Sequence, residues 1–491
     1  MQIQDKLSQI DELAQIVGMD YVSDSLQVRE QYARDHSLVP PGMPDLVVWP
    51  GNTQEVEKIV ALCNENNIPV VPVSSKVHFN GCAIPKQGGV IVDLSRMNTI
   101  LEIDTANRLT RVEAGVTWGQ LTSELAKQEM RAIMPLAPHA ERSVVTDTLE
   151  REVPTNTVYD YGEPMQSIEV VWPNGTAFRC GSASVNGFPA SKSRGANPSG
   201  PGLDFYRFVQ GAQGTMGIVT WASLKIESIP QIDKVYFAPI DDLDYAIEFL
   251  YRILPRRIGQ ECVLLNNIDL AAMLADNTPD SMAKLQAGLP PWTLVLVISG
   301  LLRRPEEKIA YEENFLRDVL KNEFPKLALL DVLPGFPGLW RKVLPLLRNP
   351  WPSDGPYWKH RVKGASQSLF FITRPEQATQ YIDIMEAVAV RYGYPMAEVG
   401  TYIQPIEHNR ACQVEFDLFY DPQDAAETAL VAALYRDAAA ALMQAGAFFT
   451  RPYGELAPLV YERAASYTAT LKRVKKVFDP NNIMNPGQLC F

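Results

Sequence analysis

The chain has 491 residues, 46% of them apolar and 21% charged, so we expect a globular protein with two domains or one elaborated domain. Its net charge of −12 argues against nucleic acid or an anionic membrane as the main partner, because both require a basic patch. The acidic, amphipathic opening and the lack of any run of about eighteen apolar residues predict a chain without a signal peptide or a membrane span.

The cysteines are scattered along the chain without C-x-x-C spacing, at Cys63, Cys82, Cys180, Cys262, Cys412 and Cys490. Iron–sulfur and structural zinc sites need clustered thiolates, so we expect no metal site and place any electron relay in a separate protein. Unpaired thiols favour the reducing cytoplasm over an oxidising compartment.

Residues 1–40 read as a helix followed by an irregular, proline-rich stretch, and 45–50 as a strand. Asn52 or Thr53 can cap the next helix, with Glu55 as the carboxylate of a capping box. Residues 68–73 return to the sheet and 90–94 form another strand, which gives a β–α–β unit. The apolar residues of the intervening helix share one face: Val56, Ile59, Val60 and Cys63.

The loop after the strand 68–73 is built from small and polar residues. Such a loop leaves backbone N–H groups free to point inward, and a cluster of them binds an anion, here most naturally a phosphate. The stretch contains neither a G-x-G-x-x-G fingerprint nor a Walker G-K-[ST] motif. The candidate binding residues are Pro72, Val73, Ser74, Ser75, Lys76, Val77, His78, Phe79, Asn80 and Gly81.

Further along, residues 112–116 end a strand, 117–128 read as a helix, and 167–172 pairs with 176–179 as a hairpin around Asn174-Gly175. Residues 181–203 are loop by composition. From about residue 230 strands and amphipathic helices alternate: 306–320 and 376–391 read as helices, and 293–299, 367–373 and 413–420 as strands. This region is long enough for its own core.

Five segments, in order, resemble the FAD-linked oxidases and dehydrogenases related to p-cresol methylhydroxylase (PCMH), vanillyl-alcohol oxidase, D-lactate dehydrogenase and the glycolate oxidase flavoprotein. They are residues 44–74, 88–98, 112–121, 208–226 and 478–487. The resemblance implies an α+β fold with a PCMH-type FAD-binding domain at 1–229, an inserted cap of antiparallel sheet and helices at 230–447, and a segment at 448–491 that returns to the FAD domain.

The resemblance further implies that FAD is the cofactor and that the loop 72–81 holds its pyrophosphate. Some relatives attach FAD covalently through a histidine near the position of His78, although an ordinary loop histidine is the alternative; His408 is a second possible tether. The other residues implied in FAD binding are Pro138, Ser143, Val144, Thr148, Gly211, Gly214, Gly217, Ile218, Val219 and Asn485.

Two departures from the family pattern concern glycines. Relatives carry adjacent glycines where this chain has the run Ser74 to Val77, and it also lacks the glycines of a flavin-binding loop at 143–148. A Cβ restricts positive φ and close approach of the backbone. The pyrophosphate is then held differently, with Lys76 adding a charge, or the chain is a non-catalytic paralogous subunit without flavin.

Three polar clusters in the cap are candidates for chemistry. The cationic, aromatic run 357–363 suits a carboxylate or phenolate substrate through Arg361, or is a solvated edge. In the second cluster Tyr402 and Gln404 share one side of a strand, and Glu415 lies between apolar neighbours. His408 there is a base, a tether or a turn residue.

The third cluster contains Arg451 and Tyr453. By resemblance to vanillyl-alcohol oxidase-like enzymes, this pair stabilises negative charge as hydride leaves. The alternative is that Arg451 only pairs with an acidic residue at the domain boundary.

The resemblance implies an FAD-dependent dehydrogenase that transfers a hydride from an alcohol, a 2-hydroxy acid or a phenolic substrate to flavin N5. Electrons then pass to an electron-transfer flavoprotein, a cytochrome or an iron–sulfur subunit, or to oxygen, and the enzyme is a homo- or hetero-oligomer. The flavin-free subunit is one alternative. A C–C bond-forming or reductive member of the superfamily is another.

Overall fold

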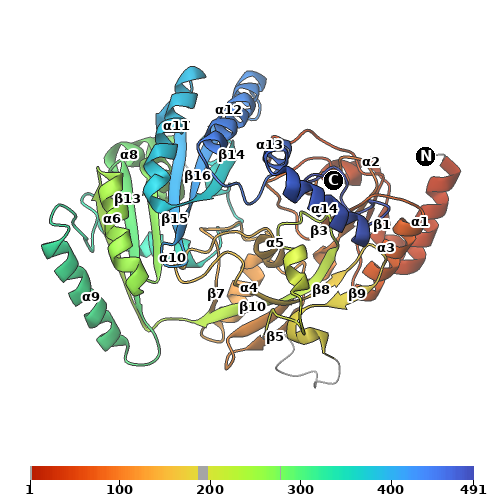
Figure 1. Cartoon of the computed structure of the whole chain (residues 1–491), viewed down its shortest axis with the longest axis horizontal. Coiled ribbons are helices and arrows are strands. Elements are labelled where there is room, and N and C mark those ends of the chain that lie inside the picture. Colours follow the sequence, from red (N-terminus) through yellow and green to blue (C-terminus); the bar gives the residue numbers. More distant parts are fainter. Residues whose placement is uncertain (1–2, 186–196, 277) are drawn as a thin grey trace.

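The computed structural model describes residues 3–185, 197–276 and 278–491, and in these residues the strands form three sheets. The first two sheets build one side of the molecule and the third sheet, with its helices, builds the other (Figure 1). Mixed helices and largely antiparallel sheets agree with the predicted α+β class.

The first sheet has the order β1-β2-β4-β3, with β2, β4 and β3 parallel. Its strands are β1 (Val22–Ser23), β2 (Leu46–Val48), β3 (Val70–Val73) and β4 (Val90–Asp93), and its helices are α1 (Ile3–Val17), α2 (Leu26–Gln31) and α3 (Thr53–Glu65). Asn52 caps α3 by accepting a hydrogen bond from the Glu55 amide at 3.0 Å, and Glu55 accepts one from the Gly51 amide at 2.7 Å. The predicted β–α–β unit and capping box are confirmed.

The second sheet has the order β5-β6-β10-β8-β9, and β7 pairs with the far end of β10. Its elements are β5 (Ile100–Asp104), β6 (Leu109–Glu113), α4 (Trp118–Ala126), β7 (Met130–Ala132), α5 (Val144–Leu149), β8 (Met165–Val171), β9 (Ala177–Arg179) and β10 (Ile218–Ser228). The predicted Asn-Gly hairpin joins β8 and β9, with Gly175 at φ 78°. Of the predicted loop 181–203, residues 186–196 lie outside the described residues.

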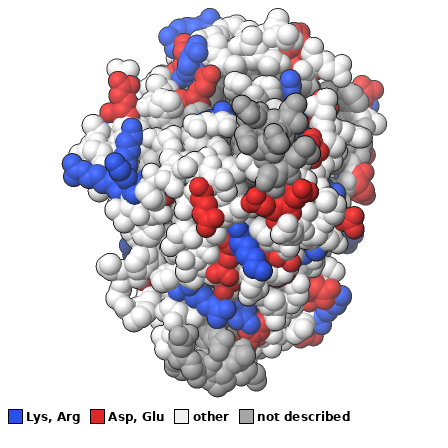
Figure 2. Space-filling model, turned by 90° about the vertical axis from the view of Figure 1, so that its right-hand side faces the viewer, with Lys and Arg blue, Asp and Glu red and all other residues white. Residues whose placement is uncertain are grey.

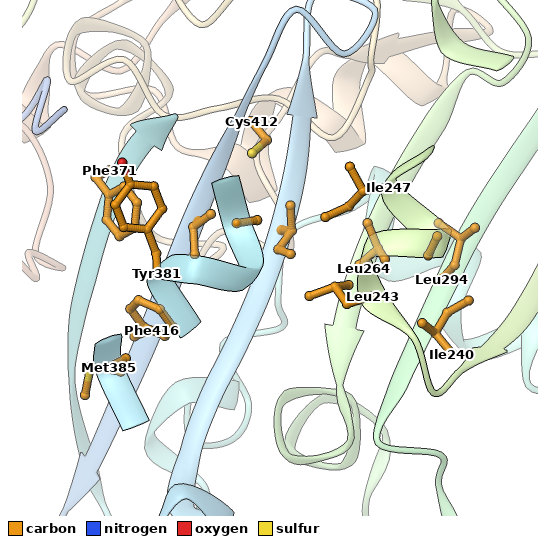
Figure 3. Packing of buried hydrophobic residues seen from close by; sticks show 14 of the residues in the cluster. Ile240, Leu243, Ile247, Leu264, Leu294, Phe371, Tyr381, Met385, Cys412 and Phe416 are labelled. Atoms are coloured by element: carbon orange, nitrogen blue, oxygen red, sulfur yellow. The ribbon is translucent and has the colours of Figure 1, made fainter. Parts of the chain in front are cut away.

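The third sheet is antiparallel, with the order β11-β13-β12-β15-β16-β14. Its strands are β11 (Ile232–Ile240), β12 (Glu261–Asn266), β13 (Trp292–Gly300), β14 (Ala365–Thr373), β15 (Val399–Ile406) and β16 (Ala411–Tyr420). Helices α6 (Leu243–Ile253), α9 (Pro305–Asn322), α11 (Ala378–Arg391) and α12 (Ala425–Gln444) bury one face in an apolar core. Figure 3 shows this core, where Phe371 and Phe416 from the strands meet Tyr381 and Met385 from α11.

The other face of the third sheet packs on its β11–β13–β12 side against α7 (Asn267–Leu274), α8 (Pro279–Gly288) and α10 (Trp340–Arg348). On its β15–β16–β14 side this face carries polar residues, because alternate strand residues point to opposite faces. That polar strip faces the loops of the first two sheets.

The C-terminal residues return to the first two sheets through α13 (Leu456–Arg463) and α14 (Ala465–Phe478) (Figure 1). Val70 of β3 donates to the carbonyl oxygen of Ile483 at 2.7 Å and accepts from the Asn485 amide at 2.8 Å. Buried Lys475 of α14 donates to the carbonyl oxygen of Thr215 at 2.6 Å. The chain end is therefore fixed beside β3 and the glycine-rich run that precedes β10.

On the face shown in Figure 2, basic and acidic side chains are interspersed among neutral ones. Among the helices of the described residues, none combines the length and the apolar character that crossing a membrane would require.

Candidate functional site

A first cavity, of about 740 Å³ with its open mouth included, lies between the end of β3, helix α5 and the start of β10. Its walls combine apolar side chains with backbone and a few polar groups. The lining residues are Pro72, Val73, Ser74, His78, Cys82, Ala83, Leu94, Ala114, Val145, Thr146, Leu149, Glu150, Val209, Ala212, Gln213, Gly214, Gly217, Ile218 and Val219.

The loop after β3 presents free backbone donors. The amides of Ser75 to Asn80 donate no hydrogen bond to any described residue. None of these residues has a positive φ, whereas Gly81, which directly follows them, has φ 77°. The missing glycine pair is therefore no conformational obstacle, and the loop keeps the row of N–H groups that an anion requires. Lys76 is exposed.

The segment 143–148, predicted as a loop, is helix α5, which corrects that expectation. Ser143 begins the helix because its hydroxyl accepts a hydrogen bond from the Thr146 amide at 3.1 Å and donates to the Ala114 carbonyl at 2.6 Å. The missing glycines are not needed in a helix. Inside α5 the hydroxyl of Thr148, a predicted FAD-binding residue, donates to the carbonyl oxygen of Val144 at 2.8 Å.

Three residues of α5 that the sequence reasoning missed line the first cavity: Val145, Thr146 and Leu149. The Thr146 hydroxyl is hydrogen-bonded to that of Ser74. Their spacing of i, i+1 and i+4 after a capping serine is a helix signal that could have identified this wall.

Glycines before β10 bring the backbone against the first cavity. Gly214 has φ 72°, and a Cβ there would lie 2.6 Å from Pro72 Cγ; a Cβ on Gly217 would lie 2.8 Å from Val170 Cγ2. The side-chain amide of Asn485 donates through Nδ2 to the carbonyl oxygens of Gln213 at 2.8 Å and Cys82 at 2.9 Å. Gly211, also predicted here, lies beside Arg151 and outside this cavity.

The residues present fit FAD. Besides the free amides, Ser75 Oγ, Gln213 Oε1 and Asn485 Oδ1 are buried without a hydrogen-bond partner among the described residues. A nucleotide with a charged pyrophosphate and an apolar ring supplies partners for these donors and acceptors and packs on the apolar walls. The loop 74–81, α5 and residues 212–219 would hold it.

A second cavity, of about 720 Å³ with its open mouth, lies on the other side of α5, against the polar strip of the third sheet. Cross-strand register builds that strip: Tyr402 lies opposite Glu415, Gln404 opposite Gln413, and Gly400 opposite Asp417. The lining residues are Phe79, Asn80, Pro135, Leu136, Pro138, His139, Arg142, Asp147, Glu152, Val153, Tyr357, Lys359, Ser366, Ser368, Phe370, Tyr402, Gln413 and Glu415.

Tyr402 and Glu415 form the centre of the second cavity. The Tyr402 hydroxyl donates to Glu415 Oε2 at 2.6 Å, and Gln413 Nε2 donates to the same oxygen at 2.7 Å. Lys359, from the short helix η6 (Trp358–His360), pairs with Glu415 and lies 3.1 Å from Asp417. Burial and the neighbouring Glu415 raise the pKa of Tyr402 well above its usual value, so the phenol is protonated at neutral pH.

Arg451 joins this strip to the first two sheets. Its guanidinium lies 2.7 Å from Glu152 and donates to Gln413 Oε1 at 3.0 Å. Arg142, 3.8 Å from Glu152, also pairs with Asp147. Burial raises the pKa of Glu152, but Arg451 and Arg142 more than offset that effect and hold it below its usual value. The predicted acidic partner of Arg451 is therefore present, and it lies in the cavity wall.

Of the other predicted residues, Tyr453 bonds to Glu150 at the boundary of the first cavity. Arg361 is not brought to either cavity: it donates to the Ala272 carbonyl at 2.7 Å and to that of Ala275, at the end of α7. Lys359, two residues earlier, occupies the cavity instead, because the single turn of η6 points these two side chains in different directions.

The two candidate tethers also separate. His78 lines the first cavity, with Nε2 2.6 Å from the Ser75 carbonyl oxygen. His408 lies in the β15–β16 turn at φ 56°, outside both cavities, and its amide donates to the Thr157 carbonyl at 2.7 Å. Phe79, Asn80 and Pro138 line the second cavity rather than the first.

Comparison with known proteins gives two family matches. Residues 44–181 match the FAD binding domain, and residues 416–489 match the C-terminal domain of FAD linked oxidases. The first matched segment contains β3, the loop 74–81 and α5, which contribute to the walls of both cavities, whereas Tyr402, Gln413 and Glu415 of the second cavity lie outside both matched segments.

Individual proteins similar to this chain are of the same kind as these two family matches. The chain is 26% identical over 306 residues to a probable mitochondrial D-lactate dehydrogenase of Danio rerio, covering 62% of this chain and 58% of that protein's length. It is 23% identical over 479 residues to the flavoprotein subunit of 4-cresol dehydrogenase (hydroxylating) of Pseudomonas putida, covering 91% and 87%. A crystal structure of p-cresol methylhydroxylase with substrate bound superposes with a TM-score of 0.85 at 20% identity, covering 100% and 98%.

The structural likeness shows a PCMH-type FAD-binding fold with two domains. The two family models and the residues of the first cavity identify FAD as the cofactor. The chain therefore carries an FAD binding domain and the C-terminal domain of FAD linked oxidases, and it is similar over most of its length to PCMH-type flavoproteins.

Proposed function

We propose that this chain is an FAD-dependent dehydrogenase that removes a hydride from an alcohol, a 2-hydroxy acid or a phenolic substrate and passes the electrons to a separate protein acceptor. Residues 1–229 and 448–491 hold FAD, and residues 230–447 cap the substrate. The observation that carries the proposal is the second cavity, where the FAD-binding loops meet Tyr402, Glu415 and Lys359. The six free thiols support a cytoplasmic location.

The bound flavin supplies the acceptor for the hydride. Side chains of the second cavity accept the proton of the substrate hydroxyl. Because the Tyr402 hydrogen is donated to Glu415, the Tyr402 oxygen is free to accept the substrate proton while its own proton moves to Glu415. Lys359 and Gln413 fix Glu415 from its other sides, so the relay is oriented before substrate arrives.

The charges of the second cavity favour a substrate that enters neutral. Lys359, Arg142 and Arg451 each pair with at least one carboxylate, so a carboxylate substrate would compete for cations already neutralised. A phenol or alcohol needs only to donate a hydrogen bond. The names of two solved relatives, p-cresol methylhydroxylase and a 4-ethylphenol oxidase from Gulosibacter chungangensis, are in line with a phenolic substrate.

The substrate class is tested with the purified protein, an artificial dye acceptor and two substrate series, 4-alkylphenols and short 2-hydroxy acids. We expect kcat/KM to be at least about tenfold higher for the phenols. Preference for the hydroxy acids would reverse the assignment within the proposed activity. If neither series, nor a simple alcohol, reduces the dye with flavin bound, the dehydrogenase proposal is wrong.

The mode of FAD attachment is tested by the visible spectrum before and after acid precipitation. Because His78 Nε2 is occupied by the Ser75 carbonyl and His408 lies outside both cavities, we expect the flavin bands to be released into the supernatant. Bands that stay with the pellet would show a covalent link, and the variant His78→Ala would then identify the tether. A protein that stays colourless after reconstitution with FAD would instead support the flavin-free subunit.

A further inference from the structure

Asp269 is a buried acid whose carboxyl group has no hydrogen-bond partner among the described residues. It lies in the first turn of α7, is 0% exposed, and neither carboxyl oxygen has a hydrogen-bond partner among the described residues. Its backbone amide, in contrast, donates to Asn266 Oδ1 at 3.1 Å. Burying an ionised carboxylate without hydrogen-bond donors is strongly unfavourable, so an acid in this position is expected to keep its hydrogen.

Gly400 places this acid beside Asp417. A Cβ on Gly400 would lie 2.8 Å from Asp269 Cγ and closer still to Oδ1, so the Asp269 carboxyl fills the space of a side chain at position 400. Gly400 is the direct cross-strand partner of Asp417. Side chains of such partners lie on the same face with Cβ atoms about 4.5–5.5 Å apart. The Asp269 carboxyl therefore lies beside the position from which the Asp417 side chain projects.

Asp417 has one oxygen free to receive that hydrogen. Its Oδ1 accepts from Lys359 Nζ at 3.1 Å and from the Ser368 hydroxyl. Its Oδ2 is buried and has no partner among the described residues, and the side chain is 0% exposed. The unpartnered oxygens of Asp269 and Asp417 thus lie close together where α7 meets β15 and β16.

We propose that Asp269 is a positioning residue: it stays un-ionised and donates its hydrogen to Asp417, directly or through one buried water. Asp417 thereby stays ionised and holds Lys359 against Glu415 and Tyr402. The inference rests on the proposed function only for its effect on turnover. The hydrogen of Asp269 is not transferred in the reaction, so the proton balance of the relay is unchanged.

The electrostatic surroundings agree with this assignment. Burial raises the pKa of Asp269 well above its usual value, and the negative charges of Asp417 and Glu415 raise it further, against the opposing effect of Lys359. These three groups, from β16 and η6, are the charged groups that act on Asp269. Burial also raises the pKa of Asp417, to about 6, which leaves Asp417 ionised at neutral pH, where we expect Asp269 to keep its hydrogen.

The test compares two matched amide substitutions, Asp269→Asn and Asp417→Asn. An amide keeps a donor in place of the Asp269 hydroxyl, so we expect Asp269→Asn to retain kcat within about threefold, whereas Asp417→Asn, which removes a charge, should lose roughly ten- to a hundredfold. Asp269→Leu, which has no donor, should resemble Asp417→Asn in kcat while KM changes little. Equal damage from both amides, or full activity of Asp269→Leu, would contradict the inference.

A second readout does not depend on turnover. The infrared difference spectrum of wild type minus Asp269→Asn, recorded near neutral pH, should contain the C=O stretch of an un-ionised carboxylic acid. The same band should be present when the effect of Asp269→Asn is recorded in the Asp417→Asn background. A difference spectrum that contains carboxylate bands and no carboxylic acid band would show that Asp269 is ionised. That result would overturn the inference even if the substrate class proposed above proves correct. The band in a protein that oxidises no tested substrate would leave the assignment of Asp269 standing and reject only the proposed function.

Discussion

Replacing Tyr402 with phenylalanine is expected to lower kcat by about 10²- to 10⁴-fold, the range typical of a positioned proton-transfer group, with KM and flavin content nearly unchanged. The phenylalanine ring occupies the same volume, and Glu415 keeps its bonds to Lys359 and Gln413. Only the oxygen that accepts the substrate proton is lost. Steady-state kinetics with a dye acceptor, together with the visible spectrum of the variant, provide the measurement.

Tyr394→Phe is the matched control. Tyr394 is also buried in the third sheet's domain, and its hydroxyl donates to the Phe419 carbonyl at 2.7 Å, but it packs in the apolar core on the opposite face. Loss of this bond should cost about 1 kcal/mol of stability and leave kcat unchanged. If Tyr402→Phe retained activity at the level of Tyr394→Phe, Tyr402 would have no part in proton transfer.

The second large effect is on stability. Arg451→Met should lower the free energy of unfolding by about 3 kcal/mol, because it leaves Glu152, whose side chain is only 20% exposed, without its principal cation. Thermal unfolding should show a Tm lower by several degrees. The double variant Arg451→Met/Glu152→Gln removes the orphaned charge as well, so it should recover most of the loss. A double variant no more stable than Arg451→Met would mean that the pair contributes through packing alone.

The same pair predicts a pH dependence. The pKa of Glu152 is lowered in the folded protein, so the pair contributes stability above the unfolded value, about 4.3 for glutamate, and that contribution is lost as pH falls through the lowered folded pKa. In Arg451→Met, the effect of burial on the pKa of Glu152 is opposed only by the more distant Arg142 and Lys359, so the carboxyl protonates at higher pH. The difference in Tm between wild type and Arg451→Met should therefore be largest near neutral pH and shrink in acid. A difference independent of pH would contradict this assignment.

Local signals in the sequence predicted much of the fold. The capping box at Asn52 and Glu55, the β–α–β unit and the Asn174-Gly175 hairpin all form as expected, because capping, periodicity and turn chemistry act within a few residues. Alternation along β15 likewise placed Tyr402 and Gln404 on one face. Residues 143–148 form a helix instead of the expected loop, because the Ser143 side chain caps its first turn.

The family motifs predicted the FAD site, but the missing glycines did not have the effect on the loop that the family pattern suggested. The run Ser74 to Val77 lacks glycines, yet the loop turns without a positive φ until Gly81, so its amides remain available to an anion. Whether a position needs glycine depends on its backbone angle, and that angle follows from how β3 and β4 pair, which the loop's own composition does not specify.

The sequence by itself determined the elements, the two-part organisation and the cofactor family, since these follow from short-range patterns and ordered motifs. Tertiary structure alone decided which polar residues meet. Lys359 rather than Arg361 reaches Glu415, Arg451 reaches Glu152 about 300 positions earlier, and Asp269 fills the gap left by Gly400. Each of these contacts depends on strand register and on the packing of elements distant in the chain, which no local pattern encodes.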